Sequence, residues 1–491
     1  MSAVEAVSAP SRRVGRDGWP KYVPLALVVL WYFLWSARLS VEIHRGYGTS
    51  AFDIGLYDQG LWLLSHFKAP FVTLMGRNMF GDHTSFTLIL LVPLYWIHPN
   101  PSTLLVVQAL VIALAAVPVY LLAMRRTGSV AIATVLSAAL LLHPALAQSN
   151  LENYHPDSFL VLFIALAIYA ALEDKYRLFV VAAVLTMLTK EDSVLVIVPL
   201  GLWVAWRRNR KLGLSIAGVS VVWTLLATNV VMRSLIGVPT LNSWRVPFGG
   251  PAGLVKRTFT KPGDVTSYLW GENRPWYVWQ MLVPFGFVFL AAPEVAAIGV
   301  LVLLSNVVSN FLYQHLIGYH YVMPILPAVA MGTVFAVAKL RRPALRYGAT
   351  ALVGVCALTT AYMWGPYSFS RQQIAHWAPS YYVVHEIEAI RKQVPPNAVL
   401  SSYHAYAPHL SHRARIYMWP TPFRAAYWKT FKQEGERLSF ANEIQYVILP
   451  TQLDFDSEQV WEPIRADFKV VATNSAATLY KRIRPEPATA G

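Results

Sequence analysis

Acids, histidines and one lysine gather in short segments of this sequence, each beside a long apolar run. The segments are Phe52-Asp53-Ile54-Gly55-Leu56-Tyr57-Asp58-Gln59, Gly81-Asp82-His83, Glu152-Asn153-Tyr154-His155-Pro156-Asp157 and Thr189-Lys190-Glu191-Asp192, and His320 precedes a further apolar run. Charged groups close to lipid are costly, so such residues indicate a functional site. Their types suit proton transfer by a carboxylate, contact with a phosphate, or binding of a divalent cation.

The first segment holds two acids, Asp53 and Asp58, that are five residues apart. On a helix this spacing corresponds to a rotation of about 140°, so the two side chains would not share a face. We therefore expect one carboxylate to face a cavity and the other to support the structure. The carboxylate in the cavity can take a proton from a hydroxyl or hold a divalent cation on a phosphate. A helix cap and a loop acid at the membrane interface would give the same sequence.

The second and third segments also allow a structural or a functional role. Asp82 is expected first as a helix N-cap, and His83 as a contact for a phosphate or a metal. His155 and Asp157 could orient a substrate or share a metal. A polar turn that caps the next helix is the alternative for this pair.

The fourth segment forms a charged hairpin between two closely spaced apolar runs. Lys190 would meet a phosphate while Glu191 or Asp192 holds its ammonium group in place. Salt-bridged packing, which lowers the cost of charge near lipid, is the alternative. His320 lies between two tyrosines, where interface aromatics are the ordinary expectation, and is the weakest candidate.

The elements that position these segments must be membrane helices. The 491 residues are 55% hydrophobic and 14% charged, with a mean hydropathy of +0.42, whereas an ordinary soluble domain is about 25% charged. A helix needs roughly 20 apolar residues to cross the hydrocarbon core, and lipid offers the backbone no other hydrogen-bond partner.

The net charge of +15 comes from Lys and Arg in short loops between the apolar runs, where they set orientation. No soluble module carries a basic face, so we expect no nucleic-acid partner. The single cysteine, Cys356, excludes an intramolecular disulfide and a multi-cysteine zinc site. The sequence also has no Walker A loop, no nucleophile elbow and no HExxH motif.

The positive-inside rule predicts about eleven spans, with the N-terminus in the cytoplasm and the C-terminus outside. Residues 86–97 are too short to span and are expected to lie in the interface, which keeps Arg125 and Arg126 inside. The spans are expected near 23–39, 102–124, 129–146, 158–173, 177–190, 192–206, 213–234, 278–291, 294–312, 322–339 and 347–364. This topology places every segment described above outside.

Three regions follow from the topology. Residues 1–22 form a cytoplasmic segment, 23–364 a transmembrane domain with outer loops 41–101 and 235–277, and 365–491 a soluble extracytoplasmic domain. Five strand-like runs alternate with helical stretches in the last region and predict a small α/β domain, the strands lying at 398–401, 415–419, 445–449, 468–473 and 477–481.

These features resemble the C-type glycosyltransferases, which are multi-spanning enzymes that use polyprenyl-phosphate sugars. In that superfamily an acid follows the first span, interfacial helices come next, and the second span ends in basic residues. Residues 52–57, 81–97 and 120–126 match these three positions. More closely, the chain resembles a family of bacterial predicted membrane proteins of unknown function, through its FDIGLYDQ, FGDHTSF, NYHPDSF and TKED segments and Pro408-His409-Leu410-Ser411-His412-Arg413.

The resemblance implies a catalytic aspartate at Asp53. From the segments themselves we expect the following residues to bind substrate: Asp58, Asp82, His83, His155, Asp157, Lys190, Glu191, Asp192 and His320. It implies a hexosyl or pentosyl transferase of the plasma membrane that moves a sugar from a polyprenyl-phosphate donor to a glycan or other cell-envelope acceptor. Many members carry two adjacent acids where Ile54 follows Asp53 here, so the need for a divalent cation stays open. The alternative is a non-catalytic binder or transporter of a lipid-linked intermediate, although no internal repeat is visible.

Overall fold

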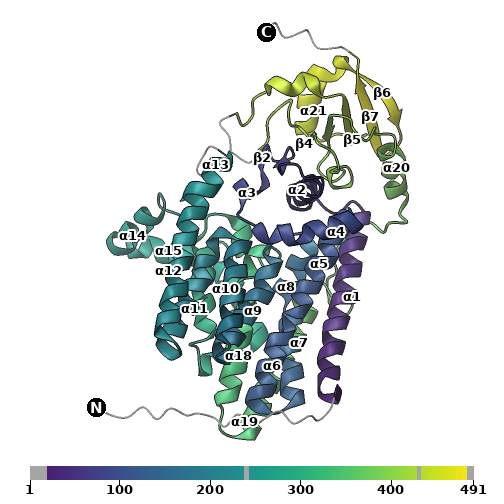
Figure 1. Ribbon diagram of the computed structural model, residues 1–491. Helices are drawn as coiled ribbons and strands as arrows, with labels where there is room; N and C mark the ends of the chain where they lie inside the picture. The colour runs from purple at the N-terminus through teal and green to yellow at the C-terminus, as the bar shows by residue number, and fades with distance from the viewer. Residues whose placement is uncertain (1–18, 237–242, 428–432, 484–491) are drawn as a thin grey trace.

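The computed structural model describes residues 19–236, 243–427 and 433–483, and its two parts are stacked in Figure 1. A bundle of upright helices forms the lower part, and a sheet with short helices forms the upper part. We call the helix ends beside the sheet the upper ends. Most of the expected segment 1–22 lies outside the described residues, as do 237–242, 428–432 and 484–491 of the expected outer loop and C-terminal domain.

Five helices among the described residues are long and apolar enough to cross a membrane, namely Pro20–Arg45, Pro101–Thr127, Arg210–Ile236, His320–Lys339 and Pro343–Trp364. A sixth span results if Val130–Leu141 and Pro144–Glu152, which bend by 44°, are counted as one. Four further apolar helices have 10–17 residues: Phe86–Ile97, Ser158–Leu172, Tyr176–Thr189 and Ala296–Val308. The expected total of about eleven spans stays a prediction.

The bundle is built from helices whose burial differs with their position. They are α1 (Val23–Arg45), α5 (Pro101–Leu114), α6 (Ala116–Thr127), α7 (Val130–Leu141), α8 (Pro144–Glu152), α9 (Ser158–Leu172), α10 (Tyr176–Thr189), α11 (Val194–Arg207), α12 (Arg210–Leu226), α17 (Val300–Val308), α18 (Leu326–Lys339) and α19 (Pro343–Trp364). Helices α9 and α18 are buried along nearly their whole length. Helices α1, α12 and α19 instead expose apolar side chains such as Leu27, Val222 and Val355, as a lipid-facing surface requires.

The chain between α12 and α18 departs from the expected pair of spans at 278–291 and 294–312. Helix α16 (Arg274–Leu282) is followed by the 3-10 turns Val283–Phe285, Val288–Ala291 and Ala296–Gly299, and then by α17. The helix breaks because Pro284 has no N–H group, while Gly286 and Phe287 have positive φ angles of 57° and 55°. One continuous span at 278–291 was therefore a wrong prediction.

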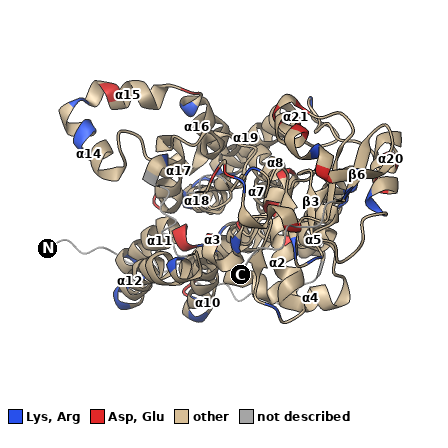
Figure 2. Ribbon diagram, turned by 90° about the horizontal axis from the view of Figure 1, so that it is seen from above, with Lys and Arg blue, Asp and Glu red and all other residues tan. Residues whose placement is uncertain are grey.

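Short elements cover the upper ends of the bundle. They are α2 (Leu56–Ser65), the hairpin β1 (Phe71–Val72) and β2 (Arg77–Asn78), α3 (Met79–Asp82), the 3-10 turn η3 (Phe86–Leu91), α4 (Val92–Ile97) and α13 (Arg233–Ile236). In Figure 1, α4 lies across the upright helices rather than parallel to them, as we expected of an interfacial segment. Helices α14 (Pro251–Thr260) and α15 (Pro262–Trp270) project sideways from the bundle (Figure 2).

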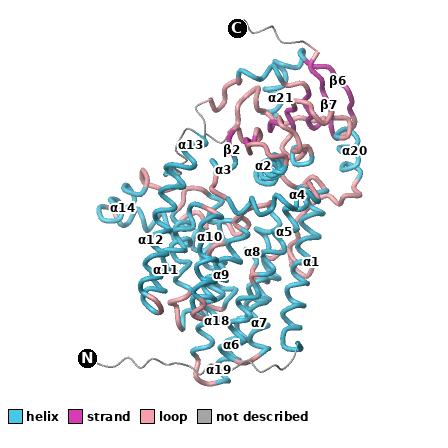
Figure 3. The backbone as a smooth tube through the Cα atoms, in the orientation of Figure 1, coloured by secondary structure: helices cyan, strands magenta, loops and turns pink. Residues whose placement is uncertain are grey.

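The upper part contains a five-stranded mixed sheet, and apart from the β1–β2 hairpin the strands in Figure 3 lie there. Its strands, in spatial order, are β4 (Ile416–Met418), β3 (Leu400–Ser402), β5 (Tyr446–Pro450), β7 (Ala477–Arg482) and β6 (Phe468–Thr473). Strand β3 pairs in parallel with β4 and β5, and β7 pairs antiparallel with β5 and β6. Helices α20 (Tyr382–Arg391) and α21 (Phe455–Trp461) accompany the sheet.

Candidate active site

Nine of the ten predicted site residues converge at the upper ends of the bundle. Contacts link them in one network: Asp53 to His155, His155 to His320, Lys190 to Asp157 and Asp192, and Glu191 to His83, which lies beside Asp82. Tyr321 joins the two halves, since its ring contacts His320 and lies 5.6 Å from the Lys190 ammonium group. We call these nine residues, together with Glu152, the upper polar cluster.

Asp53 has a strained backbone within this cluster. It lies in the irregular turn Ala51–Gly55 with φ 68° and ψ −97°, a region that a residue with a Cβ atom rarely adopts. The turn is held by hydrogen bonds from the Ala51 N–H to the His404 carbonyl at 2.8 Å and from the Gly55 N–H to the Ser50 carbonyl at 3.3 Å. Strain of this kind persists only where the surroundings impose it, and it is concentrated at active sites.

The surroundings of Asp53 also change its acidity. Its Oδ2 lies 3.7 Å from Nε2 of His155, and its side chain is 17% exposed. Burial raises the pKa of Asp53 to about 7, although the nearby His155 counteracts part of this effect. Burial lowers the pKa of His155, but Asp53 and Glu152 outweigh it and leave that pKa raised. A carboxyl group with a pKa near neutrality can exchange its proton at physiological pH, as a general base must.

Sequence reasoning missed Gln108, a fully buried residue of α5 that shapes the loop carrying His155. Its Nε2 donates to the carbonyls of Asn150 at 2.9 Å and Asn153 at 2.7 Å, and its Oε1 accepts from the N–H of His155 at 2.9 Å. The signal was present in the sequence, because a polar side chain within an apolar span needs a partner. Asn306 of α17 was missed in the same way, and it donates to the Tyr321 carbonyl at 2.9 Å.

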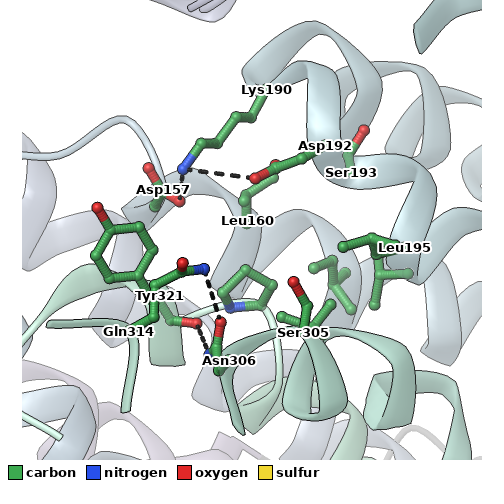
Figure 4. Close-up of a pocket in the computed structure, with 14 residues that line it drawn as sticks. Asp157, Leu160, Lys190, Asp192, Ser193, Leu195, Ser305, Asn306, Gln314 and Tyr321 are labelled. Atoms are coloured by element: carbon green, nitrogen blue, oxygen red, sulfur yellow. Dashed lines mark hydrogen bonds and ion pairs between the residues drawn. The ribbon is translucent and has the colours of Figure 1, made fainter. Parts of the chain in front are cut away.

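Lys190 is one of the polar residues that line a small cavity. Its Nζ lies 2.9 Å from Asp157 and 3.8 Å from Asp192, and Figure 4 shows it between these two acids. Burial lowers the pKa of Lys190, but the two acids outweigh it and raise that pKa, so the ammonium group stays charged. Apolar side chains from α9, α11 and α17 line the cavity: Leu160, Ile164, Leu195, Val196 and Val302.

Glu191 points away from Lys190 and binds His83 instead. Its carboxylate contacts Nδ1 of His83 at 2.7 Å and accepts from the Thr84 N–H at 3.2 Å. The two side chains shift each other's pKa in opposite directions. Burial raises the pKa of Glu191, but His83 outweighs it and lowers that pKa to about 2. Burial lowers the pKa of His83, but Glu191 and Asp82 raise it to about 9, so His83 is cationic at neutral pH.

The expected N-cap role of Asp82 is wrong. Helix α3 ends at Asp82, and its N-cap is Asn78, whose side chain accepts from the Phe80 N–H at 3.0 Å. The carboxylate of Asp82 is instead 3.0 Å from the guanidinium of Arg77. The sequence did not show that a short helix ends at Asp82, so we expected this residue at the start of the following helix.

The expected metal pair of His155 and Asp157 also differs from the structure. Asp157 stands at the N-cap position of α9 without a side-chain capping bond, and its carboxylate binds Lys190. His155 is accompanied by Glu152 at 2.7 Å and by the stacked ring of His320, with ring centroids 3.7 Å apart. Each of these three residues offers one ligand atom, and the three atoms lie within 4.8 Å of one another.

Asp58 lies apart from the cluster, so its expected place among the substrate-binding residues is not supported by its position. It is fully buried and accepts hydrogen bonds from the hydroxyls of Tyr95, at 2.7 Å, and Ser411. Its Oδ2 lies 3.0 Å from Nε2 of His412. Burial lowers the pKa of His412, but Asp58 outweighs it and leaves that pKa raised. The expectation that one of the two acids supports the structure agrees with this geometry.

Solved structures with a similar fold include ArnT from Cupriavidus metallidurans, once bound to undecaprenyl phosphate and once in the apo state. The bound structure is 13% identical with a TM-score of 0.55, and the match covers 94% of this chain and 100% of that chain. The apo structure is 13% identical with a TM-score of 0.57, covering 94% of this chain and 97% of that one. This likeness shows the fold alone, and it confirms the expected C-type glycosyltransferase fold.

Comparison with curated proteins gives no match for this chain. The family described as "Predicted membrane protein (DUF2079)" matches residues 47–472, which is most of the sequence. Those residues include the FDIGLYDQ, FGDHTSF, NYHPDSF and TKED segments on which the family resemblance rested. The chain therefore belongs to the DUF2079 family of predicted membrane proteins, as the sequence led us to expect.

Proposed function

We propose that this protein is a membrane glycosyltransferase that moves a hexosyl or pentosyl group from a polyprenyl-phosphate donor to a cell-envelope acceptor. The observation that carries the proposal is the placing of Asp53. Its carboxylate is held by a strained backbone in the same polar cluster as the cationic side chains of Lys190 and His83. The likeness in fold to ArnT, which was solved with undecaprenyl phosphate, supports a donor of this class.

The cavity beside Lys190 suits the two chemical halves of such a donor. Its apolar wall, formed by α9, α11 and α17, would take the first isoprene units, which enter sideways between helices. Lys190 and His83 would stand beside the phosphate and offset the negative charge that grows on it as it leaves. Ion pairs with Asp157 and Glu191 fix the position of both cations before the donor arrives.

Asp53 would act on the acceptor as a general base. Its carboxylate takes the proton of an acceptor hydroxyl, and the hydroxyl oxygen forms a bond to the anomeric carbon of the sugar. The bond from that carbon to the phosphate oxygen breaks, and the polyprenyl phosphate leaves with the electron pair. In Figure 1 the sheet stands on the same side of the bundle as the upper helix ends, so the C-terminal part can hold the acceptor on the side where the cluster lies.

The distribution of basic residues supports an outward-facing cluster. Arg125 and Arg126 end α6, Arg207 ends α11, and Lys339 ends α18. These residues lie at the ends of the bundle opposite the cluster, where they pair with Glu173 and Glu294. Positive residues mark the cytoplasmic side of a plasma-membrane protein, so we place the cluster and the C-terminal part outside and the N-terminus inside.

The test is turnover by the full chain in lipid nanodiscs. The protein is incubated with a panel of polyprenyl-phosphate hexoses and pentoses plus a cell-envelope glycan extract, and release of polyprenyl phosphate is followed by mass spectrometry. We expect release by the wild type and by Asp264→Asn, an exposed acid of α15, and none by Asp53→Asn. Undiminished release by Asp53→Asn would exclude Asp53 as the base. Saturable donor binding without release would favour the non-catalytic binder.

A further inference from the structure

Three residues from separate segments form a compact set of metal-ligating atoms. Glu152 is the last residue of α8, His155 lies in the loop before α9, and His320 begins the 3-10 turn His320–Val322 before α18. Their ligand atoms lie within 4.8 Å of one another although His320 is far from the other two in sequence. Two bases and one acid close to lipid are costly, so such a group of side chains indicates a functional site.

Among the described residues, the carboxylates of the upper polar cluster outnumber the cationic side chains that pair with them. Asp82 pairs with Arg77, Asp157 and Asp192 pair with Lys190, and Glu191 pairs with the cationic His83. Within the described residues, Asp53 and Glu152 form ion pairs with no Lys or Arg and share the single imidazole of His155. A divalent ion would balance these two carboxylates.

The nitrogen atoms point to the same conclusion. Nδ1 of His320 is buried and has no hydrogen-bond partner in the part of the chain that the structure describes. A buried polar atom without a partner costs about 1–3 kcal/mol, so it usually serves a purpose. The ring of His320 lies against that of His155, which is 3% exposed, and so holds its nitrogen atoms beside the Glu152 carboxylate.

We propose that Glu152, His155 and His320 bind one Zn²⁺ ion, with the carboxylate of Asp53 facing its open fourth position. Two imidazoles and one carboxylate with an open position are typical of catalytic zinc sites. Mg²⁺ and Ca²⁺ prefer oxygen ligands and fit this donor set poorly. Zinc ligands in a tetrahedral site lie about 3.3–3.6 Å apart. The three atoms, of which the Glu152–His155 pair is now 2.7 Å apart, can reach this spacing by small side-chain rotations.

The role of this ion rests on the proposed function, whereas its binding does not. The acceptor hydroxyl would occupy the fourth coordination position of the ion. The ion would increase the acidity of this hydroxyl, which Asp53 deprotonates. The resulting alkoxide forms the bond to the anomeric carbon, and the proton passes to Asp53, so the balance of the transfer is unchanged.

The test measures metal binding without any donor or acceptor. Full-length protein in nanodiscs is stripped with a chelator and dialysed against Zn²⁺ or Mg²⁺, and the bound metal is measured by mass spectrometry. We expect one Zn²⁺ per chain and at least tenfold weaker binding in Glu152→Gln and His320→Gln. His83→Gln is the matched control, because His83 lies in the same cluster outside the ligand set, and it should retain the ion.

Two further measurements keep the result independent of folding and of activity. Each variant is accepted only if its size-exclusion profile and its thermal transition without metal match those of the wild type, and a rise in transition temperature on adding Zn²⁺ should occur in the wild type and His83→Gln alone. Equal Zn²⁺ binding by the wild type, Glu152→Gln and His320→Gln would overturn the site, as would a wild type that binds none. A metal-free chain that still transfers sugar would overturn the role of the ion in the transfer and leave the proposed function standing.

Discussion

Replacing Asp58 by alanine tests whether the C-terminal part positions the segment that carries Asp53. Asp58 lies five residues after Asp53 and binds Ser411 and His412, which stand between β3 and β4. The substitution removes a fully buried carboxylate from the joint between the two parts of the molecule. We expect α2 and the turn that carries Asp53 to lose their attachment to the sheet.

The size of the effect follows from the contacts. At 3.0 Å and an effective dielectric constant of about 20, the Asp58–His412 pair is worth about 5 kcal/mol. The side chain of His412 is 29% exposed, so solvent screening reduces this to about half. Loss of two hydroxyl hydrogen bonds adds to the cost, and relief of the carboxylate's desolvation offsets part of it. The net loss is about 3–5 kcal/mol, as for other buried pairs that lose one partner.

The assay is thermal and chemical unfolding of the full chain in nanodiscs, with hydrogen exchange of the sheet as the local readout. Asp58→Ala should lower the unfolding temperature and speed exchange in β3 and β4, and Asp58→Asn should do so less because its amide oxygen still accepts a hydrogen bond. Turnover should fall by about a hundredfold, since a displacement of roughly 1 Å at the base has that effect. Unchanged stability and unchanged hydrogen exchange in Asp58→Ala would refute the idea that Asp58 attaches α2 to the C-terminal part.

Three further predictions concern the joint and the cluster. Since the pKa of His412 is raised in the folded protein, the pair with Asp58 contributes fully below the unfolded value of about 6.5, and its contribution is lost as the pH rises from there through the folded value. The unfolding temperature of the wild type, measured by a thermal scan at each pH, should therefore fall above that pH more than the temperature of His412→Gln. His83→Gln removes a cation and should weaken donor binding about tenfold at pH 7, measured by calorimetry, and equal affinity would exclude His83 from the phosphate site. Gln108→Leu leaves two carbonyls and one N–H without their partner, each costing about 1–3 kcal/mol, and should lower both stability and turnover, whereas a neutral effect would contradict the assigned role.

The residues of the cluster could be grouped from the sequence by the positive-inside rule. This rule assigned the loops rich in Lys and Arg to the cytoplasmic side and the loops with acids and histidines to the other side. Asp53, His155 and Lys190 were therefore expected together although their contacts were not known. Strand β6 also occupies the residues, Phe468–Thr473, where a strand was expected. These outcomes depend on local pattern and on topology alone.

Other features depended on partners that a single sequence does not reveal. The role of Asp58 is set by Ser411, 353 positions later in the chain, and the pairing of Glu191 with His83 spans 108 positions. The turn at Asp53 is irregular, and a carbonyl of the C-terminal part, 353 positions further along the chain, pairs with its Ala51 N–H. The two acids do diverge, but the helical spacing from which we expected this does not apply, because Asp53 precedes α2 and has non-helical backbone angles.

The hydrogen bond from the Ala51 N–H to the His404 carbonyl has a consequence for how the protein is made. The acidic segment leaves the ribosome early, directly after the first membrane helix, while the group that fixes its shape is synthesised when most of the chain has already been inserted. A nascent or truncated chain that ends before residue 404 would contain the apolar helices described above and Asp53 itself, but not the carbonyl that pairs with the Ala51 N–H. Under the proposed function, we therefore expect the carboxylate of Asp53 to reach its final position only when translation is nearly finished.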